Sequence, residues 1–283
     1  MEPLLVALIV GSALLHAGWN AALKLQRDPE GASTAILAVA AITSGAAALA
    51  LGGAPFPAPE GVAWALAAGL CESGYLATLA LAFRDAPLGV VYSIARGVAV
   101  VAIWPVSVLW LGEAVSLRSA AGAALLTAGL VLVGLDRGKH TALRGVAWAV
   151  ACALFIAGYH LSFKRALATG AAPAGAFTVA LVVALPVSAA RLGRRWRSRS
   201  AAALRASPLV VAGAGVLCAA SFLLFLVALA RGGAGAAVTL RNTSVLFALL
   251  LAWMMGERPG RWQVAGILGV AAGAMVLGWP RGG

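Results

Sequence analysis

Apolar runs of about twenty residues recur along the whole chain, and they constrain its fold more than any other feature. No water satisfies backbone N–H and C=O groups inside a bilayer, so each run must close its own hydrogen bonds as a helix. A helix of about 20 residues also matches a hydrocarbon core of roughly 30 Å. The chain is 62% hydrophobic and 11% charged. This composition is typical of a polytopic membrane protein, and no remaining segment is long enough for a soluble domain.

Ten such segments are separated by loops rich in glycine, proline and charge. They span residues 3–23, 33–51, 62–82, 88–111, 119–135, 144–163, 173–190, 208–230, 235–255 and 262–279. The sequence therefore predicts an all-α integral membrane protein with ten transmembrane helices. Cysteines 71, 152 and 218 lie inside these runs without the spacing of a metal site or a disulfide framework, so we expect no metal and no cofactor.

The two halves of the chain match each other at nearly constant offsets. A shift of 140 aligns GWNAALK with GYHLSFK, and a shift of 144 aligns Gly112-Glu113 with Gly256-Glu257. A shift of 147 aligns Cys71, Tyr75 and Arg84 with Cys218, Phe222 and Arg231. One five-helix unit is thus used twice, and since five is odd, the second copy must be inverted. We expect the first repeat at residues 1–136 and the second at residues 137–283.

The segment GERPGRWQVAGILGVAAGAMVL, residues 256–277, carries a Gly-Glu pair, a glutamine and glycines at helical spacing. It resembles the end of helix 9 and helix 10 of the EamA type in the drug/metabolite transporter superfamily. The first copy, GEAVSLRSAAGAALLTAGLVLVG, is less similar, and the spacing of Trp19, Asn20 and Lys24 differs slightly from the family. The resemblance implies an all-helical carrier of small metabolites with ten helices in an inverted repeat. We expect the protein in the plasma membrane.

Two arginines lie inside apolar segments. Arg96 falls in LGVVYSIARGVAVVAIWPVSVLWLGE, and Arg241 occupies a matching place in AVTLRNTSVLFALLLAWMMGE. An arginine near mid-bilayer costs roughly 2.5 to 3.5 kcal/mol on insertion scales. The inversion predicts the two arginines on either side of the midplane, with an electropositive cavity between them. Guanidinium groups suit carboxylate or phosphate, so we expect an anionic headgroup there. The alternative is that each arginine snorkels or binds backbone carbonyls for structural reasons.

Glu72 is the only carboxylate deep in a segment, and its repeat partner is Ala219. A carboxylate with a purely structural role would more readily be present in both repeats. A buried carboxylate can take up and release a proton, as coupling requires. A structural role as partner of Arg96 or of a helix dipole is the alternative. Tyr92 lies one turn before Arg96 and Tyr75 about one turn after Glu72, so each extends the same polar face.

Five further side chains are expected to point inward, because polar groups on a membrane helix avoid lipid. They line the pocket or form interhelical hydrogen bonds: His16, Trp19, Asn20, Tyr159 and His160. Asn242 follows Arg241 directly and either joins this pocket or faces a neighbouring helix. Lys24 and Lys164 are predicted interfacial anchors. The glycines of segments 119–135 and 262–279 predict close backbone packing, in a scaffold or at a dimer face.

The basic run RLGRRWRSRSAAALR, residues 191–205, contributes strongly to the net charge of +12. In a membrane protein such a run holds a loop in the cytoplasm, so we expect no nucleic-acid partner. The loops on one side hold 14 lysines and arginines and those on the other hold 5. The positive-inside rule then predicts both termini outside, whereas members of the resembled family are usually drawn with both inside.

These observations predict a secondary carrier, not an enzyme, which moves a small anionic or zwitterionic metabolite by alternating access. Glu72 is the candidate for proton coupling, and no Walker lysine loop indicates ATP as the direct drive. A flippase for an anionic lipid-linked substrate is the close alternative. An integral membrane transferase is the weaker one, because no nucleophile–base set or metal cluster is evident. Expected partners are the small-molecule substrate and membrane lipids, and the protein is expected to be a monomer or homodimer.

Overall fold

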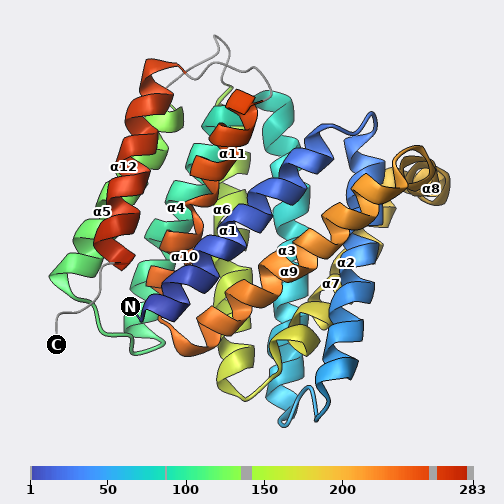
Figure 1. Cartoon of the computed structure of the whole chain (residues 1–283), viewed down its shortest axis with the longest axis horizontal. Helices are drawn as coiled ribbons and strands as arrows, with labels where there is room; N and C mark the ends of the chain where they lie inside the picture. Colours follow the sequence, from blue (N-terminus) through green and yellow to red (C-terminus); the bar gives the residue numbers. More distant parts are fainter. Residues whose placement is uncertain (1, 87, 135–141, 255–259, 279–283) are drawn as a thin grey trace.

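The computed structural model describes residues 2–86, 88–134, 142–254 and 260–278. In these ranges the chain is all-helical (Figure 1). The helices are α1 (Pro3–Lys24), α2 (Pro29–Leu51), α3 (Pro59–Asp85), α4 (Leu88–Leu109), α5 (Leu117–Gly134), α6 (Leu143–Ala168), α7 (Pro173–Leu192), the 3₁₀ turn η1 (Gly193–Arg195), α8 (Trp196–Ala206), α9 (Pro208–Arg231), α10 (Ala234–Arg241), α11 (Ser244–Met254) and α12 (Arg261–Gly278).

Proline sets the start of several helices. The first residue of α1, α2, α3, α7 and α9 is proline, whose missing N–H is one that the first helical turn leaves without an intrahelical partner. Asp28 adds a cap, because its carboxylate accepts from the backbone N–H of Gly31 at 3.1 Å. These signals start α2 and α3 several residues before the predicted positions 33 and 62.

Eight helical stretches within the described residues are long and apolar enough to cross a membrane. The shorter apolar helices Ile94–Leu109 and Leu117–Val133 account for the other two predicted segments. The chain is therefore a multi-pass membrane protein.

Two details differ from the sequence prediction. The expected loop 191–207 is largely helical, and the expected single helix 235–255 is interrupted between α10 and α11.

The helices run alternately up and down (Figure 1). The N-terminus and the connections α2–α3, α4–α5, α6–α7 and α9–α10 lie at one end of the bundle, which we call the N-terminal end. The connections α1–α2 and α7–α9 lie at the other, which we call the α8 end. The main contacts are α1 with α9, α3 with α6, α4 with α6, α2 with both α7 and α9, α3 with α7, and α5 with α12.

The α5–α12 pair packs backbone against backbone. A Cβ added at Gly129 would lie 2.5 Å from the Val270 nitrogen, and one added at Gly266 would lie 2.5 Å from the Gly129 carbonyl oxygen. Only glycine fits a crossing this close. The glycine faces of these two helices thus pack against each other. Of the two alternatives that the sequence left open, a scaffold and a dimer face, this contact corresponds to the scaffold.

Candidate functional site

Arg96 of α4 is buried at the centre of the bundle and contacts two other elements. Its Nη2 lies 3.0 Å from Nε2 of His16 on α1, and its Nη1 donates to Oδ1 of Asn242 at 3.5 Å. Asn242 follows α10, so α1, α4 and the end of α10 converge here. Of the two placements that the sequence left open for Asn242, the structure has its side chain in the cluster with Arg96.

The imidazole of His16 also contacts Trp19, whose Nε1 lies 3.3 Å from Nδ1 of His16. A neutral imidazole accepts at one ring nitrogen only. His16 can therefore accept from Arg96 or from Trp19, but not from both at once. The contact to Arg96 is shorter, and a charged donor makes the stronger bond, so we assign the acceptor lone pair to Nε2.

Arg241 is only 1% exposed, which makes it one of the most deeply buried large side chains of the described residues. Its guanidinium carbon lies 4.4 Å from the ring centroid of Phe222 and 4.1 Å from that of Phe225, both on α9. Its Nη2 donates to Oγ of Ser221 at 3.5 Å, while Nη1 has no hydrogen-bond partner among the described residues. Cation–π contacts of this kind contribute about 0.5 to 2 kcal/mol each, so the phenylalanines hold the guanidinium in position.

The helix that carries Arg241 is broken directly after it. The amides of Asn242 and Thr243 bond to the carbonyls of Thr239 and Leu240, three residues back, at 3.1 Å each. These are 3₁₀ bonds, and a 3₁₀ stretch inside a longer helix often marks a hinge. The break places Arg241 at the end of α10 and Asn242 in the turn, so adjacent residues face different partners.

Glu72 of α3 is buried within electrostatic range of Arg241 and of Tyr159. Its Oε2 has no hydrogen-bond partner among the described residues. Glu72 and Arg241 are thus electrostatic neighbours, and a structural pairing of Glu72 with Arg96 stays a prediction. Arg96 and Arg241 also lie within electrostatic range of each other, so the charged groups form one cluster.

Tyr159 and His160 of α6 complete this cluster. The ring centroids of Tyr159 and His160 are 4.1 Å apart, and Tyr75 of α3 lies 6.0 Å from Tyr159. Nδ1 of His160 lies 2.7 Å from the Ile156 carbonyl oxygen and must be the protonated nitrogen. Nε2 is then an acceptor, and it has no partner among the described residues.

Two further sequence candidates contact His16 of their own helix. Asn20 donates through Nδ2 to the His16 carbonyl of its own helix at 2.7 Å. Trp19 packs edge-on against His16 at 5.3 Å between ring centroids. Tyr92 is part of α4, but its side chain lies outside the described residues, as does that of Lys24.

A second polar cluster lies at the N-terminal end. Nζ of Lys164 donates to the carbonyl oxygens of Leu229 and Gly232 at 2.9 and 2.7 Å. Glu113 accepts from the backbone N–H of Ala234 at 2.6 Å and caps the start of α10. Lys164 is thus bound to the end of α9, and its role as an interfacial anchor stays a prediction. Together Lys164 and Glu113 tie the α9–α10 connection to α6 and to the α4–α5 connection.

A pocket of about 740 Å³ opens beside this second cluster. Its lining includes Trp104, Glu113, Arg118 and Arg231. The lining residues that the structure describes do not include Arg96 or Arg241. The electropositive cavity expected between these two arginines stays a prediction.

Sequence reasoning missed Ser221, Phe225, Lys164 and Glu113 as functional candidates, and it treated Phe222 only as the repeat partner of Tyr75. Phenylalanine and serine inside an apolar helix carry no signal that distinguishes them from packing residues. The Lys-to-carbonyl and Glu-to-amide contacts join segments that are about 65 and 121 residues apart, and no local pattern encodes them.

Comparison with known proteins agrees with this architecture. Residues 143–279 match the EamA-like transporter family. A solved crystal structure is similar over 96% of this chain and 95% of its own, with a TM-score of 0.74 and 18% sequence identity. At that identity the likeness shows a shared fold and nothing about the substrate.

Proposed function

The chain carries a domain of the EamA-like transporter family, in the drug/metabolite transporter superfamily, at residues 143–279, and from this premise we propose that it is a secondary carrier for a small anionic or zwitterionic metabolite. Membership implies membrane transport, and proteins of this family are typically not enzymes. We propose the class of substrate, the coupling and the residues of the site.

The observation that carries it is a set of unpartnered polar atoms in the bundle core. Nη1 of Arg241, Oε2 of Glu72, Nε2 of His160 and Nδ2 of Asn242 are buried without a hydrogen-bond partner among the described residues. Buried polar groups are nearly always satisfied, and each unsatisfied one costs about 1 to 3 kcal/mol. Four such atoms from α3, α6, α10 and the turn after it support a site that a polar ligand completes.

The charges of the cluster favour an anion or a zwitterion. Arg96 and Arg241 supply two guanidinium groups, each suited to two parallel hydrogen bonds with a carboxylate or phosphate. Glu72 is a carboxylate within electrostatic range of Arg241, and it leaves a net positive site that also accommodates an ammonium group. Tyr159, Tyr75 and Phe222 supply aromatic walls for the remainder of the molecule, with His16 and Asn242 as further polar contacts.

We further propose two inverted repeats, at residues 1–136 and 137–283. The helix contacts support this, because the main contacts between a helix of the first half and one of the second have counterparts between the equivalent helices of the opposite halves. The contact of α1 with α9 corresponds to that of α6 with α3, and α2 with α9 corresponds to α7 with α3. Inverted repeats typically hold the solute where the copies meet, and one repeat rocks against the other.

Alternating access needs one closed end at a time. The contacts of Lys164 and Glu113 support a closed N-terminal end, since they bind the α9–α10 connection to α6 and the α4–α5 connection. Opening that end would break these hydrogen bonds. The 3₁₀ turn at Asn242 and Thr243 is a suitable hinge, because it lies between α10, which these contacts hold, and α11.

Proton coupling is assigned to Glu72 in this proposal. A proton on Glu72 would remove the negative charge that acts on Arg241, which frees the guanidinium for a substrate anion. The proposal also has the carrier in the plasma membrane as a monomer or homodimer, with both termini outside, as the distribution of lysine and arginine favours.

The test is uptake by the full chain in proteoliposomes against a panel of carboxylates, phosphates, amino acids and amines. We expect Arg96→Gln and Arg241→Gln each to reduce transport of the accepted anion at least about tenfold, because a hydrogen bond to a charged group contributes about 1.5 to 3 kcal/mol. Arg261→Gln is the matched control, since Arg261 is exposed at the start of α12. Monodisperse elution of each variant verifies folding. Uptake of every tested anion at wild-type rates by both variants would overturn the proposed site.

A further inference from the structure

The helix α8 stands apart from the bundle that surrounds the candidate site. In Figure 1 it is seen end-on at the edge of the molecule, while α7 and α9, which it joins, run across the view. A helix that crosses the direction of the membrane-spanning helices, at the end where they leave the hydrocarbon core, lies along the membrane surface. Among the described residues, the α8 end also carries the larger number of lysines and arginines.

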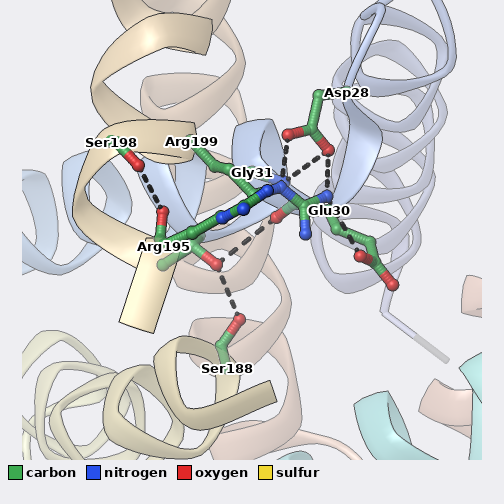
Figure 2. A network of polar contacts seen from close by, with 8 residues as sticks. Asp28, Glu30, Gly31, Ser188, Arg195, Ser198 and Arg199 are labelled. Carbon is green, nitrogen blue, oxygen red and sulfur yellow. Dashed lines mark hydrogen bonds and ion pairs between the residues drawn. The ribbon is translucent and has the colours of Figure 1, made fainter. Parts of the chain in front are cut away.

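The arginines of η1 and α8 fall into two groups. Arg199 points toward α2, where its Nε and Nη2 donate to the two carboxylate oxygens of Asp28 at 2.7 and 2.6 Å (Figure 2). Nη2 also lies 3.1 Å from Oε2 of Glu30. Because Asp28 caps α2 at the same time, this contact fixes α8 to the start of α2.

The other group faces outward. Arg194, Arg195, Arg197 and Arg205 are exposed, and none has an ion-pair partner among the described residues. Arg195 engages Ser198 only through its backbone carbonyl, which accepts at 2.9 Å (Figure 2). Among the arginines of η1 and α8, Arg199 is thus neutralised by two carboxylates, while four others are exposed cations.

Exposed apolar side chains lie among these cations. Trp196 is 38% exposed and Leu204 is 39% exposed, and the Arg197 guanidinium lies 5.2 Å from the Trp196 ring centroid. Tryptophan and arginine side by side are typical of helices at the depth of the lipid headgroups. A lipid offers an apolar part to the tryptophan and a charged headgroup to the arginine. A soluble anion would use only the charges.

We propose that the outward face of α8, formed by Arg194, Arg195, Trp196, Arg197, Leu204 and Arg205, is a binding surface for anionic phospholipid headgroups. The phosphates pair with the arginines, and the acyl-chain side packs against Trp196 and Leu204. Through Arg199 and Asp28 the bound lipid stabilises the junction of α8 with α2. This inference does not depend on the identity of the transported solute.

The experiment measures phosphatidylglycerol binding to the purified full chain by native mass spectrometry, with phosphatidylcholine as the neutral lipid. The variant carries Arg194→Gln, Arg195→Gln and Arg205→Gln. Each arginine near an anionic surface contributes about a fivefold change in affinity, so the triple variant should bind phosphatidylglycerol about 100-fold more weakly. Binding to wild type should also weaken at high salt, because exposed charges are screened.

The matched control carries Arg27→Gln, Arg84→Gln and Arg261→Gln, which removes the same charge from exposed positions at the same end of the bundle. It should keep wild-type affinity, and replacing the three α8 arginines with lysine should keep most of it. An equal loss in the control variant would overturn the proposal, because it would indicate net charge alone. Equal competition by inorganic phosphate would overturn it as well, since the site would then bind free anions.

Discussion

The crossing of α5 and α12 gives the most quantitative prediction, through Gly129→Ala. The added Cβ would lie 2.5 Å from the Val270 nitrogen, 2.7 Å from the Gly266 carbonyl oxygen and 2.8 Å from the Gly269 carbonyl carbon. All three are backbone atoms, which cannot rotate away as a side chain can. The helices would have to separate by about 1 Å to restore ordinary van der Waals contact at 3.4 to 4 Å.

Overpacking of this kind costs about 1 to 3 kcal/mol, while alanine in place of glycine gains about 1 kcal/mol from helix propensity. The difference between these two effects is a net loss, so we expect Gly129→Ala to lower the free energy of unfolding by up to about 2 kcal/mol. For a chain of this size the loss corresponds to a decrease in Tm of roughly 2 to 4 °C per kcal/mol. Thermal unfolding in detergent, followed by tryptophan fluorescence, measures it.

Gly213→Ala is the control for this prediction. Gly213 lies inside α9, and a Cβ added there meets nothing within 4 Å, so the propensity gain should remain and Tm should be unchanged or higher. If Gly129→Ala is as stable as Gly213→Ala, the α5–α12 backbones do not approach as described, and the reasoning fails.

Three further predictions concern charged groups. Glu72→Gln should abolish any dependence of transport on a pH gradient in proteoliposomes, and an unchanged dependence would remove Glu72 from coupling. Glu113→Gln should loosen the start of α10 by about 1 kcal/mol and raise hydrogen exchange at Ala234; unchanged exchange would argue against Glu113 as the cap. The Arg199 guanidinium holds the pKa of Asp28 below its usual range, so the stabilisation is present above the pKa of unfolded Asp and is lost as the pH falls toward the folded pKa. Asp28→Asn should therefore cost about 1 kcal/mol or less at neutral pH and show a smaller loss of Tm below about pH 4 than wild type does.

The sequence anticipated the composition of the candidate site better than its geometry. Arg96, Arg241 and Glu72 are recognisable because a charge inside an apolar run is rare and costly. The spacing of His16 predicts its helix face, whereas Asn242 is a candidate only because it follows Arg241, and both contact Arg96. The side chains that hold Arg241, Phe222 and Phe225, were not recognisable, because an aromatic residue on an apolar helix is the commonest packing residue.

The sequence by itself determined that this chain is a bundle of membrane helices. Apolar runs of sufficient length, with glycine and proline at their boundaries, satisfy their own backbone hydrogen bonds, so helix formation in a bilayer is a local property. Which faces of those helices meet is not local. The tertiary structure alone decided that α10 ends at Arg241, that Lys164 and Glu113 hold the α9–α10 connection, and that Arg199 fixes α8 to α2. These contacts join residues far apart in the chain, and their energies depend on geometry that hydrophobic periodicity does not encode.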